Sequence, residues 1–248
     1  MYSFKSRVRY SEIDKDGIVT FPAIIDYFQD CVTFQSEDLN IGLKYLKEKK
    51  RAWVVAFWQV DVLEMPEFSR EIIINTWPYE LNGFMGYRNF TITDAKSNRL
   101  LVRANSVWVC MDTEKKRPVK IDIIEKEKYE LEEKFPMEYA SRKLSIPENL
   151  QFHQGFIVES FQLDTNGHMN NSQYIRAAWA YKKSRKKIFS LRTEYVRSAR
   201  LGETIYPKTM VSDDKEVIVL CGEGDIVYAI VELIYQKEKD FRLKIVKG

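Results

Sequence analysis

Residues 161–171 read Phe-Gln-Leu-Asp-Thr-Asn-Gly-His-Met-Asn-Asn. Between Asp164 and His168 this stretch holds a carboxylate, a carboxamide and one of only two histidines in the chain. An apolar amphipathic segment, residues 174–181, follows at once and predicts a helix. The first-turn N–H groups and the dipole of such a helix favour negative charge that develops beside them. The stretch is therefore a candidate reaction site.

An earlier stretch, residues 14–20, repeats the plan of residues 164–170 at an offset of 150. The aspartate and the glycine are kept. The asparagine and the histidine of the later copy are replaced by Asp16 and Ile18 in the earlier one. One copy therefore carries a chemical constellation, and the other carries only the same backbone plan.

Both stretches also fit ordinary turns, because Asp-x-Asn-Gly and Asp-x-Asp-Gly are common turn sequences. The adjoining His168, which the earlier copy lacks, favours the functional interpretation. A calcium loop would need a glutamate at its twelfth position, where Ala23 and Gln173 stand. The second histidine, His153, lies in a polar segment typical of a surface.

The composition indicates a globular protein with a large core. The chain has 248 residues, is 45% hydrophobic and carries a net charge of +3, which is too small to indicate nucleic-acid binding. Three widely spaced cysteines, Cys31, Cys110 and Cys221, are typical of reduced thiols. We see no apolar signal core at the N-terminus and no run long enough to span a membrane. We expect a soluble, cytoplasmic protein.

The order of predicted elements is similar in the two halves. In the first half, a strand over residues 5–10 precedes a helix that Thr20 caps and that continues to Phe34. Alternating patterns then predict the strands 53–63, 71–77, 86–93 and 100–111. The charge run at residues 125–134 indicates a solvated helix or linker.

In the second half, a strand near residues 156–161 precedes the Asp164 turn and a helix over residues 171–187. Four more predicted strands follow, at residues 189–197, 203–212, 215–222 and 225–237. Matching Ile72 with Ile205 and Ala104 with Ala229 extends the repeat at decreasing offsets. Gene duplication of one unit, made of a strand, a helix and four more strands, is the simplest account.

A curved antiparallel sheet wrapped around a long helix is the hotdog plan. We therefore predict an α+β protein with two tandem hotdog units, each a curved antiparallel sheet around a long central helix. The predicted division is an N-terminal unit at residues 1–130, a linker at 131–150 and a C-terminal unit at 151–248.

Several motifs resemble the acyl-acyl carrier protein thioesterase family. The more specific one is Asp164-x-Asn-x-His-x-Asn-Asn171 in the second half. The first half adds Trp58-Gln-Val60, Thr76-Trp-Pro78, the strand 104–112 and Arg117-Pro118. Together these motifs cover most of both halves.

The resemblance implies that Asp164, Asn166 and His168 are the catalytic residues. A thioester hydrolase needs a base or nucleophile, an orienting group and donors for the oxyanion. Asp164 could attack or polarise its neighbours, Asn166 could orient water or substrate, and His168 could move a proton. Backbone N–H groups at the start of the following helix could hold the oxyanion. Which residue attacks stays open.

One position departs from the family, which carries a further acidic residue after the strand that matches Glu194-Tyr195. Ser198 and Ala199 stand there instead. Either Ser198 acts as a hydrogen-bonding group, or Glu203 takes the acidic part, or activity is weak.

The remaining predicted contacts are with the substrate and with a carrier. The family implies that the first unit lines the acyl-chain pocket, so Ile24, Phe28 and Trp58 are predicted to touch the chain, beside Asn170 and Asn171. Residues 176–200 hold nine cations against one carboxylate, which favours a docking surface for an acidic carrier protein, with a solvated helix end as the alternative. The predicted docking residues are Arg176, Lys182, Lys183, Arg185, Lys186 and Lys187.

The resulting hypothesis is a hydrolase that releases free fatty acid from acyl-acyl carrier protein, and so ends fatty-acid elongation, without a metal or an organic cofactor. The alternatives are an acyl-CoA thioesterase and a non-hydrolytic acyl-binding protein of the same fold. The expected partners are acyl carrier protein and a fatty acyl chain, not nucleic acid, and a homodimer is left open.

Overall fold

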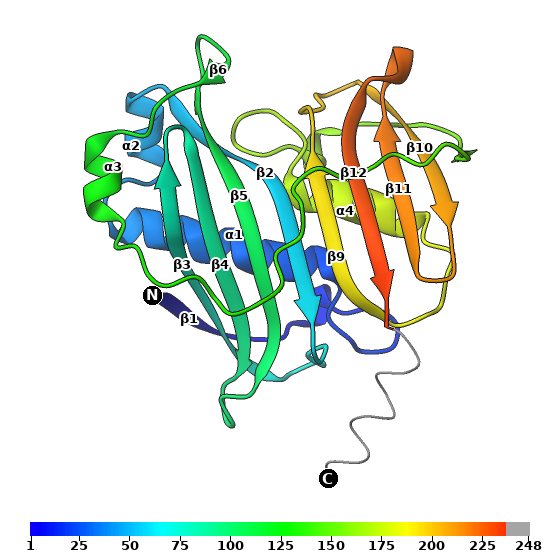
Figure 1. Cartoon of the computed structure of the whole chain (residues 1–248), viewed down its shortest axis with the longest axis horizontal. Helices are drawn as coiled ribbons and strands as arrows, with labels where there is room; N and C mark the ends of the chain where they lie inside the picture. Colours follow the sequence, from blue (N-terminus) through cyan, green and yellow to red (C-terminus); the bar gives the residue numbers. More distant parts are fainter. Residues whose placement is uncertain (237–248) are drawn as a thin grey trace. The chain divides into compact units, whose positions relative to one another are not determined.

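The structure is a computed structural model that describes residues 1–236 and divides into two compact units. The first unit is Met1–Arg142, and the second begins at Lys143 (Figure 1). The division falls inside residues 131–150.

The first unit is built on an antiparallel sheet in the strand order β1-β3-β4-β5-β2. Its elements are β1 (Tyr2–Arg7), α1 (Phe21–Asp38), α2 (Leu43–Glu48), β2 (Arg51–Val62), β3 (Glu71–Asn82), β4 (Met85–Asp94), β5 (Leu100–Asp112), β6 (Arg117–Pro118) and α3 (Ile123–Lys128). The first strand lies three residues earlier than the predicted range 5–10. It ends at Arg7 because a 3-10 turn, Tyr10–Glu12, bends the chain toward the Asp14 stretch.

Helix α1 begins where the sequence predicts. The Thr20 hydroxyl accepts a hydrogen bond from the Ala23 N–H at 3.4 Å, and Pro22 occupies the first turn, where no N–H is needed. Figure 1 shows α1 crossing one face of the sheet. On that face the Phe28 ring stacks on Trp58 at 5.7 Å and packs against a tilted Phe90 ring at 4.9 Å, measured between ring centroids. This aromatic cluster is the centre of the core of the first unit.

The opposite face of this sheet is crossed by residues 129–142, which we call the connector (Figure 1). The sequence predicted a solvated helix or linker over residues 125–134. Helix α3 instead ends at Lys128, and its Glu125 is fully buried against the Trp53 Nε1 at 3.3 Å. The connector is then bound to the sheet, because Gln59 donates to the Glu138 carbonyl at 2.9 Å.

The second unit has an antiparallel sheet in the order β9-β12-β11-β10-β7, with β8 paired to β10. Its elements are β7 (Gln151–Phe152), β8 (Phe156–Ile157), α4 (Asn171–Ala180), β9 (Ile188–Tyr195), β10 (Thr204–Val211), β11 (Lys215–Cys221) and β12 (Val227–Tyr235). The predicted strand 156–161 keeps only two residues, because a 3-10 turn begins at Ser160. Position 237 of the last predicted strand lies outside the described residues.

The helix of the second unit is shorter than predicted: α4 ends at Ala180, not near Lys187. The buried Glu216 carboxylate accepts hydrogen bonds from the backbone N–H of Lys183 at 2.9 Å and of Ser184 at 3.4 Å, and from the Tyr235 hydroxyl at 2.8 Å. A helix could not present these N–H groups to a side chain from the sheet. A tertiary contact therefore overrides the helical pattern of the sequence.

All three cysteines are buried thiols outside any disulfide. Within residues 1–236, none of the helices combines the length and the apolar character that a membrane crossing requires.

Candidate functional site

The Asp164 stretch is a tight turn that its own aspartate closes. The Asp164 Oδ1 accepts hydrogen bonds from the backbone N–H of Asn166 at 2.8 Å and of His168 at 3.1 Å. The Asp164 N–H donates to the His168 carbonyl at 2.7 Å, and Gly167 has a φ of 72°, which a glycine adopts without strain. One carboxylate oxygen of Asp164 therefore maintains the backbone of the turn.

The turn lies against residues 198–203. His168 forms a β-bridge with Arg200, and the Met169 N–H donates to the Ala199 carbonyl at 2.9 Å. His168 is half-buried and Asn166 is exposed. The structure thus brings the predicted catalytic triplet next to the predicted Ser198-Ala199 position.

Helix α4 begins directly after the turn, and Asn170 is its cap. The Asn170 side chain accepts from the Ser172 N–H at 3.0 Å, and its carbonyl accepts from the Gln173 N–H at 2.9 Å. The Asn171 carbonyl accepts from the Tyr195 hydroxyl at 2.9 Å. Two of the first-turn N–H groups expected to hold an oxyanion are therefore already bound, and Asn170 has a structural role beside its predicted substrate contact.

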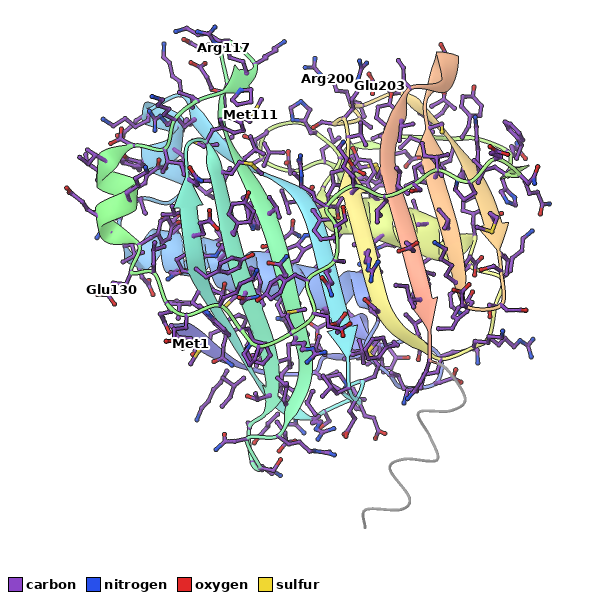
Figure 2. The ribbon with its side chains drawn as sticks, in the orientation of Figure 1. Met1, Met111, Arg117, Glu130, Arg200 and Glu203 are labelled. Carbon is purple, nitrogen blue, oxygen red and sulfur yellow. The ribbon has the colours of Figure 1, made fainter. Side chains whose placement is uncertain are left out.

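Glu203 lies in the segment that the turn contacts. Its Oε2 accepts hydrogen bonds from the Arg200 N–H and from the Tyr228 hydroxyl, both at 2.9 Å. Burial and the hydrogen bond to Glu203 raise the pKa of Tyr228 to about 12, so this hydroxyl stays a donor across the physiological range. Figure 2 shows Arg200 and Glu203 close together at one end of the second unit.

The hydroxyl of the buried Tyr174 is bonded to the segment that the turn lies against. Its hydroxyl accepts from the Ala199 N–H at 2.7 Å. Burial raises the pKa of Tyr174, and the charges of Glu203 and Asp164 act in the same direction. The sequence did not identify Tyr174 or Tyr228 as site residues. An aromatic residue at helical or strand spacing is typical of a hydrophobic core, and the spacing does not show that its hydroxyl forms a hydrogen bond.

Ser198 is exposed, and its hydroxyl has no hydrogen-bond partner among residues 1–236. It is therefore not fixed in any particular geometry by its neighbours.

The earlier stretch in the first unit has the same backbone turn. The Asp14 Oδ1 accepts from the N–H of Asp16 at 2.9 Å and of Ile18 at 3.1 Å, and Gly17 has a φ of 78°. Ile18 forms a β-bridge with Glu67, as His168 does with Arg200. The two turns differ in side chains and not in backbone.

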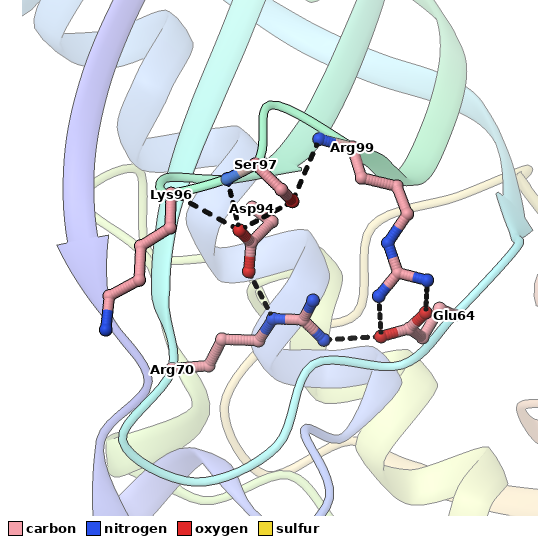
Figure 3. Close-up of polar contacts among 6 residues, drawn as sticks. All are labelled: Glu64, Arg70, Asp94, Lys96, Ser97 and Arg99. Carbon is pink, nitrogen blue, oxygen red and sulfur yellow. Dashed lines mark hydrogen bonds and ion pairs between the residues drawn. The ribbon is translucent and has the colours of Figure 1, made fainter.

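The first unit has Arg70 at the backbone position that Glu203 occupies in the second. The Arg70 N–H donates to the Glu67 carbonyl at 3.2 Å, and the Glu203 N–H donates to the Arg200 carbonyl at 3.1 Å. Figure 3 shows the Arg70 guanidinium between two carboxylates, at 2.7 Å from Asp94 and 2.5 Å from Glu64. An ion-pair network thus replaces the Glu203–Tyr228 pair.

The predicted acyl-chain residues Ile24, Phe28 and Trp58 are all fully buried in the first unit. The Trp58 Nε1 is buried and finds no acceptor within the part of the chain that the structure describes. Buried indole N–H groups normally have a hydrogen-bond acceptor. Its absence here indicates that few polar atoms surround the Trp58 ring.

The predicted docking residues lie on the end of α4 and on the loop that follows it. Arg176, Lys183, Arg185, Lys186 and Lys187 are exposed, and Lys182 is half-buried with its Nζ 5.5 Å from the Trp179 ring centroid. Burial lowers the pKa of Lys182. Because Glu216 binds the backbone at residues 183–184, this cationic loop has a fixed path.

The fold is that of known thioesterases. An acyl-ACP thioesterase from Bacteroides thetaiotaomicron superposes with a TM-score of 0.84 over 94% of this chain and 97% of its own, at 21% identity. A 12:0-ACP thioesterase from Umbellularia californica superposes with a TM-score of 0.83 over 94% and 97%, at 18% identity. The architecture is therefore the hotdog fold, with mixed helices and antiparallel strands.

The sequence defines the family more closely. The family model for the acyl-ACP thioesterase N-terminal domain matches residues 1–127, and the chain belongs to this family. A chloroplastic palmitoyl-acyl carrier protein thioesterase of Cuphea hookeriana is 30% identical over 68% of this chain and 43% of its own length. A chloroplastic acyl-[acyl-carrier-protein] hydrolase of Cuphea viscosissima is 26% identical over 84% and 54%. The chain spans about half the length of these curated relatives.

Proposed function

We propose that this protein hydrolyses the thioester of fatty acyl-acyl carrier protein and releases free fatty acid. The observation that carries the proposal is the Asp164 turn, which presents Asn166 and His168 beside residues 198–203 in a chain of the acyl-ACP thioesterase family. The names of the relatives, a palmitoyl-acyl carrier protein thioesterase among them, agree with this substrate class.

His168 is the residue that moves the proton. It takes a proton from water as the water oxygen bonds to the thioester carbonyl carbon, and it returns the proton to the thiolate when the carbon–sulfur bond breaks. The products are a carboxylic acid and the thiol of the carrier. Asp164 is less suited to attack, because one of its oxygens holds two backbone N–H groups of the turn.

Asn166 orients the water or donates to the carbonyl oxygen. Its exposed carboxamide has two donors, whereas the Ser172 and Gln173 N–H groups of the α4 N-terminus are already bound to Asn170. Glu203 takes the role of the acidic residue that the family has at the position of Ser198. Its carboxylate is fixed by hydrogen bonds from the Arg200 backbone N–H and the Tyr228 hydroxyl.

The two units are tandem hotdog units with a division of labour. The second unit carries the reaction, and the first lines the acyl-chain pocket with Ile24, Phe28 and Trp58. The loss of a histidine from the Asp14 turn and the apolar burial around α1 support this division. A cytoplasmic location is part of the proposal and rests on the three reduced cysteine thiols, although the plant relatives are chloroplastic.

The exposed cations of residues 176–187 form the docking surface for an acidic carrier protein. Reversing two of them, Lys183→Glu with Lys186→Glu, is expected to raise KM for acyl-acyl carrier protein roughly tenfold, because rim charges steer association. The KM for acyl-CoA should stay within about twofold. Equal changes for both donors would remove the docking surface from the proposal.

The test of the function is fatty acid released from a panel of acyl-acyl carrier protein thioesters, with matching acyl-CoAs alongside. Release from the carrier-bound panel is the expected result, and preferred release from acyl-CoA would change the donor. A second candidate is a non-hydrolytic acyl-binding protein, which the unpartnered Ser198 hydroxyl favours. Binding of acyl chains by folded protein without any release would support it.

A further inference from the structure

A pocket lies in the first unit, which does not contain the Asp164 turn. It has a volume of about 220 Å³, is partly open to solvent and lies between the sheet and the connector, residues 129–142. Phe57, Tyr79 and Tyr87 line it from three different strands, and Tyr139 lines it from the connector. The volume is below the range of about 300–1,000 Å³ that drug-sized ligands occupy, so an occupant must be small.

The walls of this connector pocket are aromatic and flat. The Tyr79 ring lies 5.9 Å from Tyr87 and 6.0 Å from Tyr139 between centroids, at interplanar angles of 39° and 69°. Aromatic side chains form favourable edge-to-face and offset contacts with a further ring. The lining therefore favours a planar apolar body over a sugar or a flexible polar chain.

The charged side chains that line the connector pocket are all positive. Lys134 and Arg142 line it, and neither forms an ion pair with any residue from 1 to 236. The Lys134 Nζ is 3.6 Å from the Tyr139 ring centroid and 5.4 Å from that of Tyr79, so the ammonium is held over the pocket wall. No carboxylate is among the lining residues. The pocket therefore attracts an anion.

The side-chain amide of Asn105 faces the same space. Asn105 is 4% exposed and lines the pocket. Its Oδ1 accepts from the Tyr79 hydroxyl at 2.9 Å, which fixes the orientation of the amide. Its Nδ2 donates to no group in the described part of the chain. The Asn105 Nδ2 is not one of the fully buried polar atoms without a partner, so it is accessible and can donate to an acceptor inside the pocket.

We propose that the connector pocket binds a small aromatic anion. Lys134 and Arg142 pair with its charged group, the Asn105 amide donates to it, and the ring stacks among Tyr79, Tyr87 and Tyr139. Because one wall of the pocket is the connector, an occupant would also hold the connector against the sheet. The charged group can be a carboxylate or a phosphate, which share this chemistry. The inference is independent of the proposed hydrolysis.

The experiment is calorimetric titration of the full chain with benzoate, phenyl phosphate and neutral benzyl alcohol. Both anions, or one of them, should bind at millimolar concentration, and the alcohol should bind about tenfold more weakly or not at all. The stronger of the two anions identifies the charged group. Amide hydrogen exchange in residues 129–142 should slow when the better anion is present.

The variants decide whether this pocket is the site. The double change Lys134→Gln with Arg142→Gln should weaken anion binding about tenfold or more, because two charge-assisted contacts are lost. Both residues are exposed, and an unchanged melting temperature will show that the variant is folded. Arg117→Gln with Lys120→Gln is the matched control, since these exposed cations lie in the same unit outside the pocket.

The control variant should bind like the parent chain. Binding of neither anion, or equal loss in both double variants, would overturn the proposal.

Discussion

The Asp14 turn and the Asp164 turn have the same backbone and different side chains. In both, an aspartate Oδ1 accepts hydrogen bonds from two backbone N–H groups, and a glycine adopts a positive φ. The residue after the glycine forms a β-bridge with a segment that leads into a strand. Only the second has a histidine and a nearby Glu203–Tyr228 pair. The comparison teaches that the aspartate and the glycine specify the turn, whereas the residues at positions 166, 168 and 203 are free to carry chemistry.

The strongest test of this comparison is the histidine. His168→Ala should lower kcat about 10²- to 10⁴-fold, because a general base contributes that much. Ile18→Ala, the matched change in the other turn, should leave kcat within about twofold, because no proton transfer depends on it. Steady-state release of fatty acid from acyl-acyl carrier protein measures both. Equal rates for parent and His168→Ala would move the reaction away from this turn.

The aspartate separates turn formation from chemistry. Asp164→Asn keeps an Oδ1 acceptor for both N–H groups, so the melting temperature should not change. Its lost charge beside His168 should lower kcat about tenfold, which corresponds to about 1.4 kcal/mol. Asp14→Asn should alter neither quantity. A loss as large as that of His168→Ala would instead indicate that Asp164 is the nucleophile or base.

The two units also differ at the position of Glu203, where the first unit has Arg70. Glu203→Gln retains acceptors for the Arg200 N–H and the Tyr228 hydroxyl but removes the charge, and kcat should fall about threefold to tenfold if this acid assists the reaction. Tyr228→Phe is the companion variant and should have a smaller effect. If Glu203→Gln changes only the melting temperature, the acid is structural, as Arg70 is in the first unit.

Asp94 tests the ion-pair network that replaces the Glu203–Tyr228 pair. Hydrogen bonds from the Ser97 N–H, from Arg70 and from the Ser97 hydroxyl hold the pKa of Asp94 well below its usual range. A depressed folded-state pKa contributes stability above the unfolded value of about 3.9 and loses it as the pH falls through the folded value. Urea unfolding should therefore show Asp94→Asn to be less stable than the parent at pH 7, with the gap closing below about pH 4. A gap that stays constant with pH would contradict the role of the charge.

The sequence predicted the elements that depend on local pattern. Helix α1 follows from the Thr20 cap, Pro22 and helical spacing, and strands β2 to β5 follow from alternation and turn signals. It missed the elements that depend on partners distant in the sequence. The helix α4 was predicted too long because Glu216, more than thirty residues away, takes the N–H groups of Lys183 and Ser184.

By itself, the sequence determined the two turns, because Asp and Gly at fixed spacing specify a turn through contacts within five residues. It also predicts that the second turn carries chemistry, since only that turn has a histidine. Only the tertiary structure decided that Tyr174, Glu203 and Tyr228 surround that turn, and that the connector covers a cationic aromatic pocket. The physical reason is that a side chain's hydrogen-bond partners and burial depend on strands paired across the sheet, which no local pattern encodes.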